Sequence, residues 1–189
     1  GLGHSVSHFY HLAVPVVFPL MKETLGVSFA QLGLLATLFY VASGISQFFA
    51  GMLVDRYGAR PILFLGMALV SGAVLLCGFA PTYGYFLLLM PIAGMGNSVF
   101  HPADYGILNA SVKESWLGRA YGIHTLGGNI GWAAAPLIVL GVSAFFGWRT
   151  ALVVAGLIGF AVLGILLTQS AQLHDGITDR EAHRRANPP

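Results

Sequence analysis

The chain alternates between long apolar segments and short polar connections. About 20 mostly apolar residues are needed to cross the roughly 30 Å hydrocarbon core of a bilayer. Helices are the natural spanning element because each satisfies its own backbone hydrogen bonds in lipid, whereas barrel strands would alternate in runs of about 10 residues. The pattern therefore predicts an all-α integral membrane protein with six transmembrane helices, at residues 1–21, 29–54, 61–80, 83–108, 118–145 and 148–168.

Prolines and glycines inside these segments predict bends and close contacts. A proline removes a helix hydrogen bond, and the carbonyl that it frees needs a cavity or a neighbour in a membrane. Five spanning positions are prolines: Pro15, Pro19, Pro91, Pro102 and Pro136. Small residues four positions apart let two helix backbones approach. The fifth segment has two such pairs, Gly118 with Gly122 and Gly127 with Gly131.

The composition agrees with a membrane location. Only 8% of the residues are charged and 56% are hydrophobic, whereas a soluble domain is normally about one quarter charged. The net charge of +2 and the lack of a dense basic patch argue against a nucleic-acid partner. A single cysteine, Cys77, excludes an internal disulfide framework and a multi-cysteine metal site. We expect no cofactor, and the lipid bilayer as the main surroundings.

The charged residues predict the orientation. Lys and Arg accumulate in cytoplasmic connections. Of the nine Lys and Arg residues, only Lys22 and Arg149 lie on the side of the odd-numbered connections. We therefore expect a multi-pass protein of the inner (plasma) membrane, with the connections between spans two and three and between spans four and five in the cytoplasm. Residues 1–168 would form the membrane domain, and the charged residues 169–189 a solvated cytoplasmic linker or tail.

Polar side chains inside the spans are the candidate functional residues. Ionisable groups in a membrane are costly and usually functional, and the positions of His4, His8 and His11 share one helical face. Because spans three and six carry none, we expect those two helices to be lipid-facing supports. A polar cavity for substrate and protons is predicted from His4, His8, His11, Gln47, His101, Asp104, His124 and Asn129. The alternative is that the histidines are structural and bond to neighbouring carbonyls.

Other chemistries fit the pattern less well. His4 and His8, one helical turn apart, have a spacing suited to a transition-metal or other small-ion permease, because imidazole binds several divalent metals. Histidine-ligated haem proteins usually need facing pairs, whereas spans four and five carry one histidine each. No Gly-x-Ser-x-Gly or His-Glu-x-x-His motif indicates a hydrolase, so we expect no enzyme. A further alternative is a structural membrane half that does not transport.

The connection after the second span carries the most specific motif. The segment "GMLVDRYGARP" resembles the loop motif of the major facilitator superfamily, roughly G-x-L-a-D-r-x-G-r-k, in the same connection as in that family. The resemblance implies a gating motif in which Gly51 packs against a neighbouring helix and Gly58 makes the turn. It also implies that Asp55 and Arg56 latch onto an opposite half. The matching residues are Gly51, Leu53, Asp55, Arg56, Gly58 and Arg60.

Family transporters have twelve spans in two similar halves, each built from two inverted three-helix repeats around a midplane substrate site. The resemblance therefore implies that this chain is the N-terminal half. The missing C-terminal six-helix half would follow in the same chain or come from a second copy. The first apolar segment is already under way at Gly1, so we also expect residues upstream.

Within the superfamily, "VFHPA" at Val99–Ala103 looks most like the fosmidomycin-resistance type of efflux protein. The implied function is alternating-access, proton-coupled export of a small organic solute or drug, that is, antiport linked to drug resistance. Many drug exporters carry an Arg in the fourth span where this chain has Met90. Because histidine titrates near neutral pH, His101 or His124, or else Asp104, would have to carry the protons instead.

Overall fold

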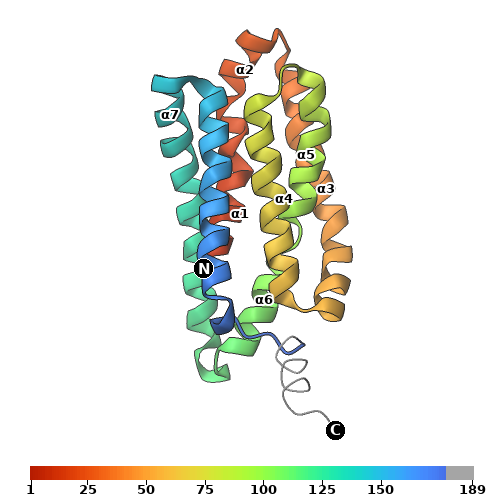
Figure 1. Cartoon of the computed structure of the whole chain (residues 1–189), viewed down its shortest axis with the longest axis vertical. Helices are drawn as coiled ribbons and strands as arrows, with labels where there is room; N and C mark the ends of the chain where they lie inside the picture. The colour runs from red at the N-terminus through yellow and green to blue at the C-terminus, as the bar shows by residue number, and fades with distance from the viewer. Residues whose placement is uncertain (178–189) are drawn as a thin grey trace.

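The computed structural model describes residues 1–177, and every regular element within them is helical (Figure 1). The chain starts with α1 (Leu2–Ala13), a 3₁₀ turn η1 (Pro15–Val17) and α2 (Phe18–Leu25). The next helices are α3 (Phe29–Tyr57), α4 (Ala59–Phe79), α5 (Tyr83–Asn97) and α6 (Phe100–Ser111). The last elements are η2 (Glu114–Trp116), α7 (Leu117–Thr168) and η3 (Ser170–Gln172). The helices lie roughly parallel or antiparallel in one elongated bundle.

Local sequence explains where several helices begin and end. A capping box starts α3, in which Ser28 Oγ accepts the Gln31 N–H at 3.2 Å and Gln31 Oε1 accepts the Ser28 N–H at 2.9 Å. The turn between α3 and α4 is made by Gly58, whose φ of 94° is unfavourable for other residues. The predicted tight turn at Gly58 is therefore confirmed.

The long element α7 consists of two antiparallel arms, residues 117–146 and 148–168. Gly147 separates them with a φ of 81° and a ψ of 157°, far from helical values. In Figure 1 the first arm (teal) rises to this point and the second (blue) descends beside it. The break predicted at Phe146-Gly147 is confirmed. Close to the same apex, the Trp148 indole donates to Thr24 Oγ1 at 2.9 Å, and Arg149 donates to the Ala80 carbonyl.

Four continuous stretches of the described chain are long and apolar enough to cross a membrane: Phe29–Tyr57, Ala59–Phe79, Tyr83–Ser111 and Glu114–Thr168. The stretch Glu114–Thr168 is one of these four although it folds back on itself at Gly147. The first predicted span is not a single helix, because Pro15 begins η1 and Pro19 lies in the first turn of α2. Helix α1, with 12 residues, is about 18 Å long, too short to cross alone.

The fourth predicted span, residues 83–108, is also interrupted, at Ser98–Val99 between α5 and α6. Pro102 has no N–H for the carbonyl of residue 98, and its ring would clash with that carbonyl in a continuous helix. In the first turn of α6 the same proline is tolerated. Pro91 and Pro136, by contrast, remain inside α5 and α7.

The main helix contacts join α1 with α7, α4 with α7, α3 with α5, and α4 with α5. Gly131 allows the contact between α1 and α7, because a Cβ at this position would overlap the Ser5 carbonyl oxygen and lie 3.1 Å from the Phe9 nitrogen. The predicted pair Gly127–Gly131 thus packs against α1. The other predicted pair, Gly118–Gly122, does not, since a Cβ at either would meet no atom of the described chain within 4 Å.

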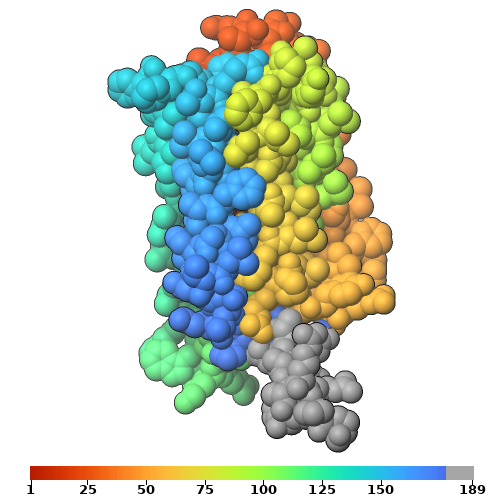
Figure 2. Space-filling model, in the orientation of Figure 1, coloured from red at the N-terminus to blue at the C-terminus, as the bar shows by residue number. Residues whose placement is uncertain are grey.

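Helix α4 and the second arm of α7 lie side by side and form one face of the molecule (Figure 2). Their inner sides are well packed: Met67 and Val70 of α4 and Leu152 and Ala155 of α7 are buried. Contact of this face with lipid stays a prediction. The turn at Gly58, the connection between α6 and α7, and the end of α7 all lie at one end of the bundle (Figure 1). The predominantly basic connections therefore share an end.

Candidate functional site

A buried group of three ionisable side chains lies between α1, α6 and α7. His4 Nδ1 is 3.2 Å from Asp104 Oδ2, and His124 Nε2 is 3.8 Å from the same oxygen. The rings of His4 and His124 stack with their centroids 3.7 Å apart. His4, Asp104 and His124 are only 3%, 8% and 2% exposed, respectively. We call these three residues the buried triad.

Small residues and the break at Ser98–Val99 make room for this arrangement. A Cβ at Gly128 of α7 would lie 2.8 Å from His8 Cε1 and 3.1 Å from His4 Cδ2, so a larger residue would displace the rings. Helix α6 starts afresh after the Ser98–Val99 break. Asp104 therefore lies within its second turn and faces α1 and α7.

Further aromatic rings extend from the buried triad toward the surface. His8 contacts both His4 and His11, with centroid distances of 4.4 and 5.3 Å, which confirms the predicted common face of these three histidines. The Trp132 ring lies 4.5 Å from His8, and the His101 ring 5.4 Å from His4. His8, His11 and His101 are half-buried and Trp132 is exposed. The rings of His8, His11, His101 and Trp132 thus connect the triad with the surface, and we call the three histidines among them the path of histidines.

A hydrogen-bond network centred on Asn97 adjoins this path. Asn97 Oδ1 accepts a bond from Ser7 Oγ at 2.8 Å, and its Nδ2 lies 3.0 Å from His11 Nε2 and 3.3 Å from Ser43 Oγ. Sequence reasoning selected none of Asn97, Ser7 and Ser43. One signal was available, because Ser7 has the same helical register as His4 and His11. Asn97 lies just before the break that Pro102 indicated, but its contacts with α1 and α3 could be recognised only from the structure.

Two predicted cavity residues are not brought into the cluster. Asn129 and Gln47 are both exposed. On α7 the buried positions are His124, Gly128, Gly131 and Ala135, and residue 129 is turned about 100° away from residue 128 in a helix with 3.6 residues per turn. Gln47 lies on a part of α3 where most side chains are exposed. Any role of these two residues stays a prediction.

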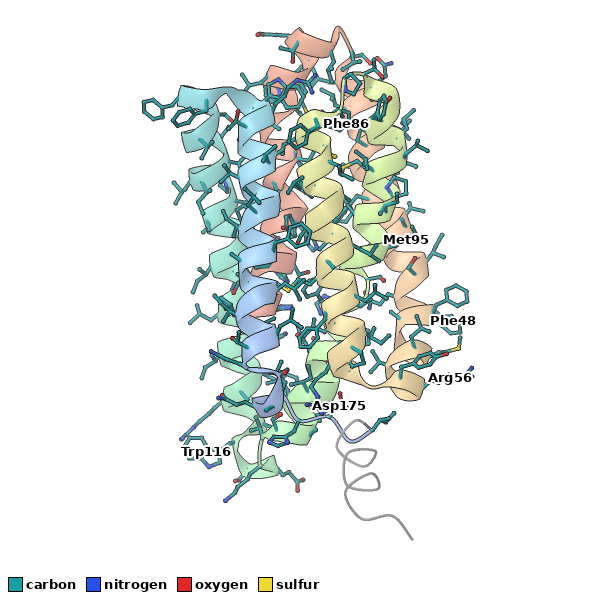
Figure 3. All side chains as sticks on the ribbon, in the orientation of Figure 1. Phe48, Arg56, Phe86, Met95, Trp116 and Asp175 are labelled. Carbon is teal, nitrogen blue, oxygen red and sulfur yellow. The ribbon has the colours of Figure 1, made fainter. Side chains whose placement is uncertain are left out.

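The gating motif lies at the end of the bundle away from the apex of α7. Asp55 and Arg56 are exposed, and Arg56 points outward from the end of α3 (Figure 3). A Cβ at Gly51 would meet no atom of residues 1–177 within 4 Å, so the close helix contact expected there is not made within this part of the chain.

The start of the predicted solvated tail is instead packed against this motif. Asp175 is only 3% exposed and lies beside the ends of α4 and α7 (Figure 3). Its Oδ2 accepts the backbone N–H of Arg60 at 3.0 Å and lies 3.4 Å from Arg60 Nε. Arg60 Nη1 also donates to the Ser170 carbonyl at 3.0 Å. The expectation of a solvated tail is therefore wrong for Asp175, and the remainder, 178–189, lies outside the described residues.

The buried triad contains polar atoms that are not used by the fold. Asp104 Oδ2 and the facing nitrogens of His4 and His124 are buried and have no partner in hydrogen-bond geometry within the described part of the chain. Buried polar atoms are normally satisfied, so these atoms are available to a proton, a metal ion or a polar solute. Such groups inside apolar helices are the usual mark of a transport or relay site.

Comparison with known proteins identifies the family. The profile of the Major Facilitator Superfamily matches residues 1–187. The fold is similar to a crystal structure of a bacterial homolog of the human lysosomal transporter Spinster, inward-facing and occupied. The TM-score is 0.80 at 22% identity, over 99% of this chain and 46% of that one.

Curated relatives have different functions. The membrane sensor protein UhpC of Salmonella typhimurium is 29% identical over 163 residues, which are 85% of this chain and 36% of that protein. The probable L-galactonate transporter of Escherichia coli is 29% identical over 84% of this chain and 35% of its own length. The fosmidomycin resistance protein of Escherichia coli is 27% identical over 77% and 36%. The chain spans about a third of these relatives, and it belongs to the Major Facilitator Superfamily of secondary transporters.

Proposed function

We propose that this chain is the N-terminal half of a proton-coupled exporter of a small organic solute that works by alternating access. The observation that carries the proposal is the buried triad, because an ionisable cluster inside apolar helices is costly unless it is used. Imidazole and carboxylate groups both take up and release protons in proteins, so neighbouring ones can pass a proton between them. Asp104 is the central proton carrier, with His4 and His124 as its partners.

The six-span arrangement is part of this proposal. The broken rod α1–η1–α2, the helices α3 and α4, the broken rod α5–α6 and the two arms of α7 would be six transmembrane segments, related as two inverted three-helix repeats. The shared basic end supports a cytoplasmic location for the turn at Gly58, the connection between α6 and α7, and the tail. The membrane would be the inner (plasma) membrane.

A second six-helix half would complete the substrate cavity. The chain spans about a third of its curated relatives, and large apolar side chains near the path of histidines, such as Tyr40 at 49% and Trp132 at 43%, are exposed. The substrate would bind between the halves, in contact with His8, His11 and His101, where protons and solute can influence each other. The second half would follow in the same chain or come from a second copy.

The gating motif would close the cytoplasmic end of this cavity. Asp55 forms no ion pair within residues 1–177, which leaves its carboxylate for an opposite half. Gly51 and Arg56 are at or near the surface at the same end. Separation of the two halves as they rock would break the contacts of Asp55 and Arg56.

The proposal further specifies the direction of transport as export, the coupling as antiport, and a role in drug resistance. They are supported by the "VFHPA" element, which supplies His101 to the path, and by 27% identity to a protein named for fosmidomycin resistance. The relative named as a membrane sensor protein supports a second candidate, a non-transporting membrane half that binds a solute and signals. Flux measurements separate these candidates.

The test is solute flux in liposomes that contain the full-length protein to which this chain belongs. With an imposed pH gradient, addition of fosmidomycin or a small organic acid should cause proton movement that a trapped pH dye reports. We expect Asp104→Asn to reduce coupled flux at least about 10-fold while the protein still inserts. Glu114→Gln is the matched control, since it removes an exposed carboxylate from a connection. Equal coupled flux in Asp104→Asn and wild type would remove Asp104 from the mechanism, and binding without flux would favour the sensor.

A further inference from the structure

The facing atoms of the buried triad have an arrangement that proton exchange alone does not require. One ligand atom from each of His4, Asp104 and His124 lies within 4.8 Å of the other two. Asp104 Oδ2 is 3.2 Å from His4 Nδ1 and 3.8 Å from His124 Nε2, yet none of the three atoms has a partner in hydrogen-bond geometry. Two imidazole nitrogens and one carboxylate oxygen therefore converge on one buried point.

This arrangement matches the requirements of a transition-metal ion. Zinc binds imidazole nitrogen and carboxylate oxygen at about 2.0–2.2 Å, and tetrahedral geometry then separates neighbouring ligand atoms by about 3.3–3.6 Å. The observed separations of 3.2 and 3.8 Å are close to that range. Three protein ligands with a fourth position left open are typical of sites where zinc also binds water or a substrate. Because the His4 and His124 rings stack with their centroids 3.7 Å apart, both rings would have to turn toward the ion.

We propose that His4, Asp104 and His124 bind one divalent transition-metal ion such as Zn²⁺. The ligands are His4 Nδ1, Asp104 Oδ2 and His124 Nε2, and the carboxylate supplies one negative charge against the ion. A cavity of about 80 Å³ lined in part by Asp104 and His124 adjoins the site and has room for a water molecule as the fourth ligand. All three ligands come from this chain, so the site does not require a second half.

The sequence indicated a different pair. His4 and His8 have a spacing suited to metal binding, but His8 is outside the group of converging atoms. Its ring instead packs between those of His4, His11 and Trp132. In the structure the partners of His4 are instead Asp104 of α6 and His124 of α7, which are about 100 positions or more away in the chain.

The test is metal binding by the full-length protein in detergent, after removal of bound metal by a chelator. Co²⁺ is the probe, because its visible absorption reports nitrogen and oxygen ligands and low coordination number. We expect one Co²⁺ per chain, displaced by Zn²⁺. The variants His4→Ala, Asp104→Asn and His124→Ala should each raise the Kd at least about 10-fold, since even outer-shell changes cost 10- to 100-fold in metal sites.

His11→Ala is the matched control, because it also removes an intramembrane histidine of α1 but none of the converging atoms. Its Kd should stay within about twofold of wild type. Thermal unfolding with and without Zn²⁺ gives a second measure: a metal that binds the folded state should raise the Tm of wild type and of His11→Ala but not of Asp104→Asn.

Absence of saturable Co²⁺ binding in folded wild-type protein would overturn the proposal, and so would an equal loss of binding in the His11→Ala control. The metal site uses the same three residues as the proton site proposed above, but metal binding and flux are measured separately. Proton-coupled flux without Co²⁺ binding would count against the metal site alone. Co²⁺ binding that depends on the three ligands, in a protein without flux, would support the metal site and count against the exporter.

Discussion

The contact between Asp175 and the start of α4 offers a direct test of how the end of the bundle is stabilised. Arg60 is the second residue of α4, so its backbone N–H has no acceptor within the helix. Asp175 Oδ2 accepts this N–H at 3.0 Å and lies 3.4 Å from Arg60 Nε. The side chains are only 4% and 17% exposed, respectively. The carboxylate is thus both a helix cap and a buried ion-pair partner.

The expected cost of Asp175→Ala follows from these two roles. Loss of a capping side chain costs about 0.5–2 kcal/mol, and hydrogen bonds to charged groups contribute about 1.5–3 kcal/mol. Because Arg60 keeps its bond to the Ser170 carbonyl and can reach water, we expect a net loss of about 2–3 kcal/mol in the free energy of local opening. Each 1.4 kcal/mol corresponds to a factor of 10, so the amide of Arg60 should exchange about 30- to 140-fold faster.

The assay is hydrogen exchange, followed by mass spectrometry, on peptides that cover the start of α4 in the full-length protein. Glu114→Ala is the control, because it removes an exposed carboxylate at the same end. Arg60→Leu removes the side-chain part of the contact but keeps the backbone bond, so a double-mutant cycle should show a smaller coupling, about 1–2 kcal/mol. Exchange at the start of α4 that does not change in Asp175→Ala would refute the reasoning.

Two further predictions concern packing inside the bundle. Gly131→Ala should lower the Tm of the full-length protein, because its Cβ would overlap the Ser5 carbonyl and overpacking costs about 1–3 kcal/mol. Gly122→Ala, which has open space within the described chain, should leave the Tm unchanged or raise it, and an equal drop in both would contradict the assigned contact. Asn97→Leu removes the shared partner of Ser7, His11 and Ser43 and should cost about 1–3 kcal/mol in unfolding free energy. If denaturant titration gives Asn97→Leu the same unfolding free energy as wild type, the network is solvated rather than structural.

Several features of the fold could be predicted from the sequence because they are local. The apolar segments indicated helices close to those observed for α3 and α4. Gly58 indicated the turn between these two helices, and Gly147 the turn between the two arms of α7. Only glycine takes a φ near 80–95° without strain, so such positions are readable without the rest of the molecule. The division of the first segment into three short helices was not predicted. Pro15 and Pro19 indicated a bend, but neighbouring helices decide how the freed carbonyls are satisfied.

The candidate site illustrates the same division between local pattern and tertiary structure. Helical periodicity alone determined that His4, His8 and His11 share a face, because residues three and four apart are neighbours on any helix. The length and apolar composition of the segments predicted the membrane location. Only the tertiary structure decided that His4 meets Asp104 and His124, that Asn129 turns away, and that Asp175 is buried against Arg60. The physical reason is that such contacts depend on the crossing and rotation of helices far apart in the chain, and these are set by close packing at positions such as Gly128 and Gly131.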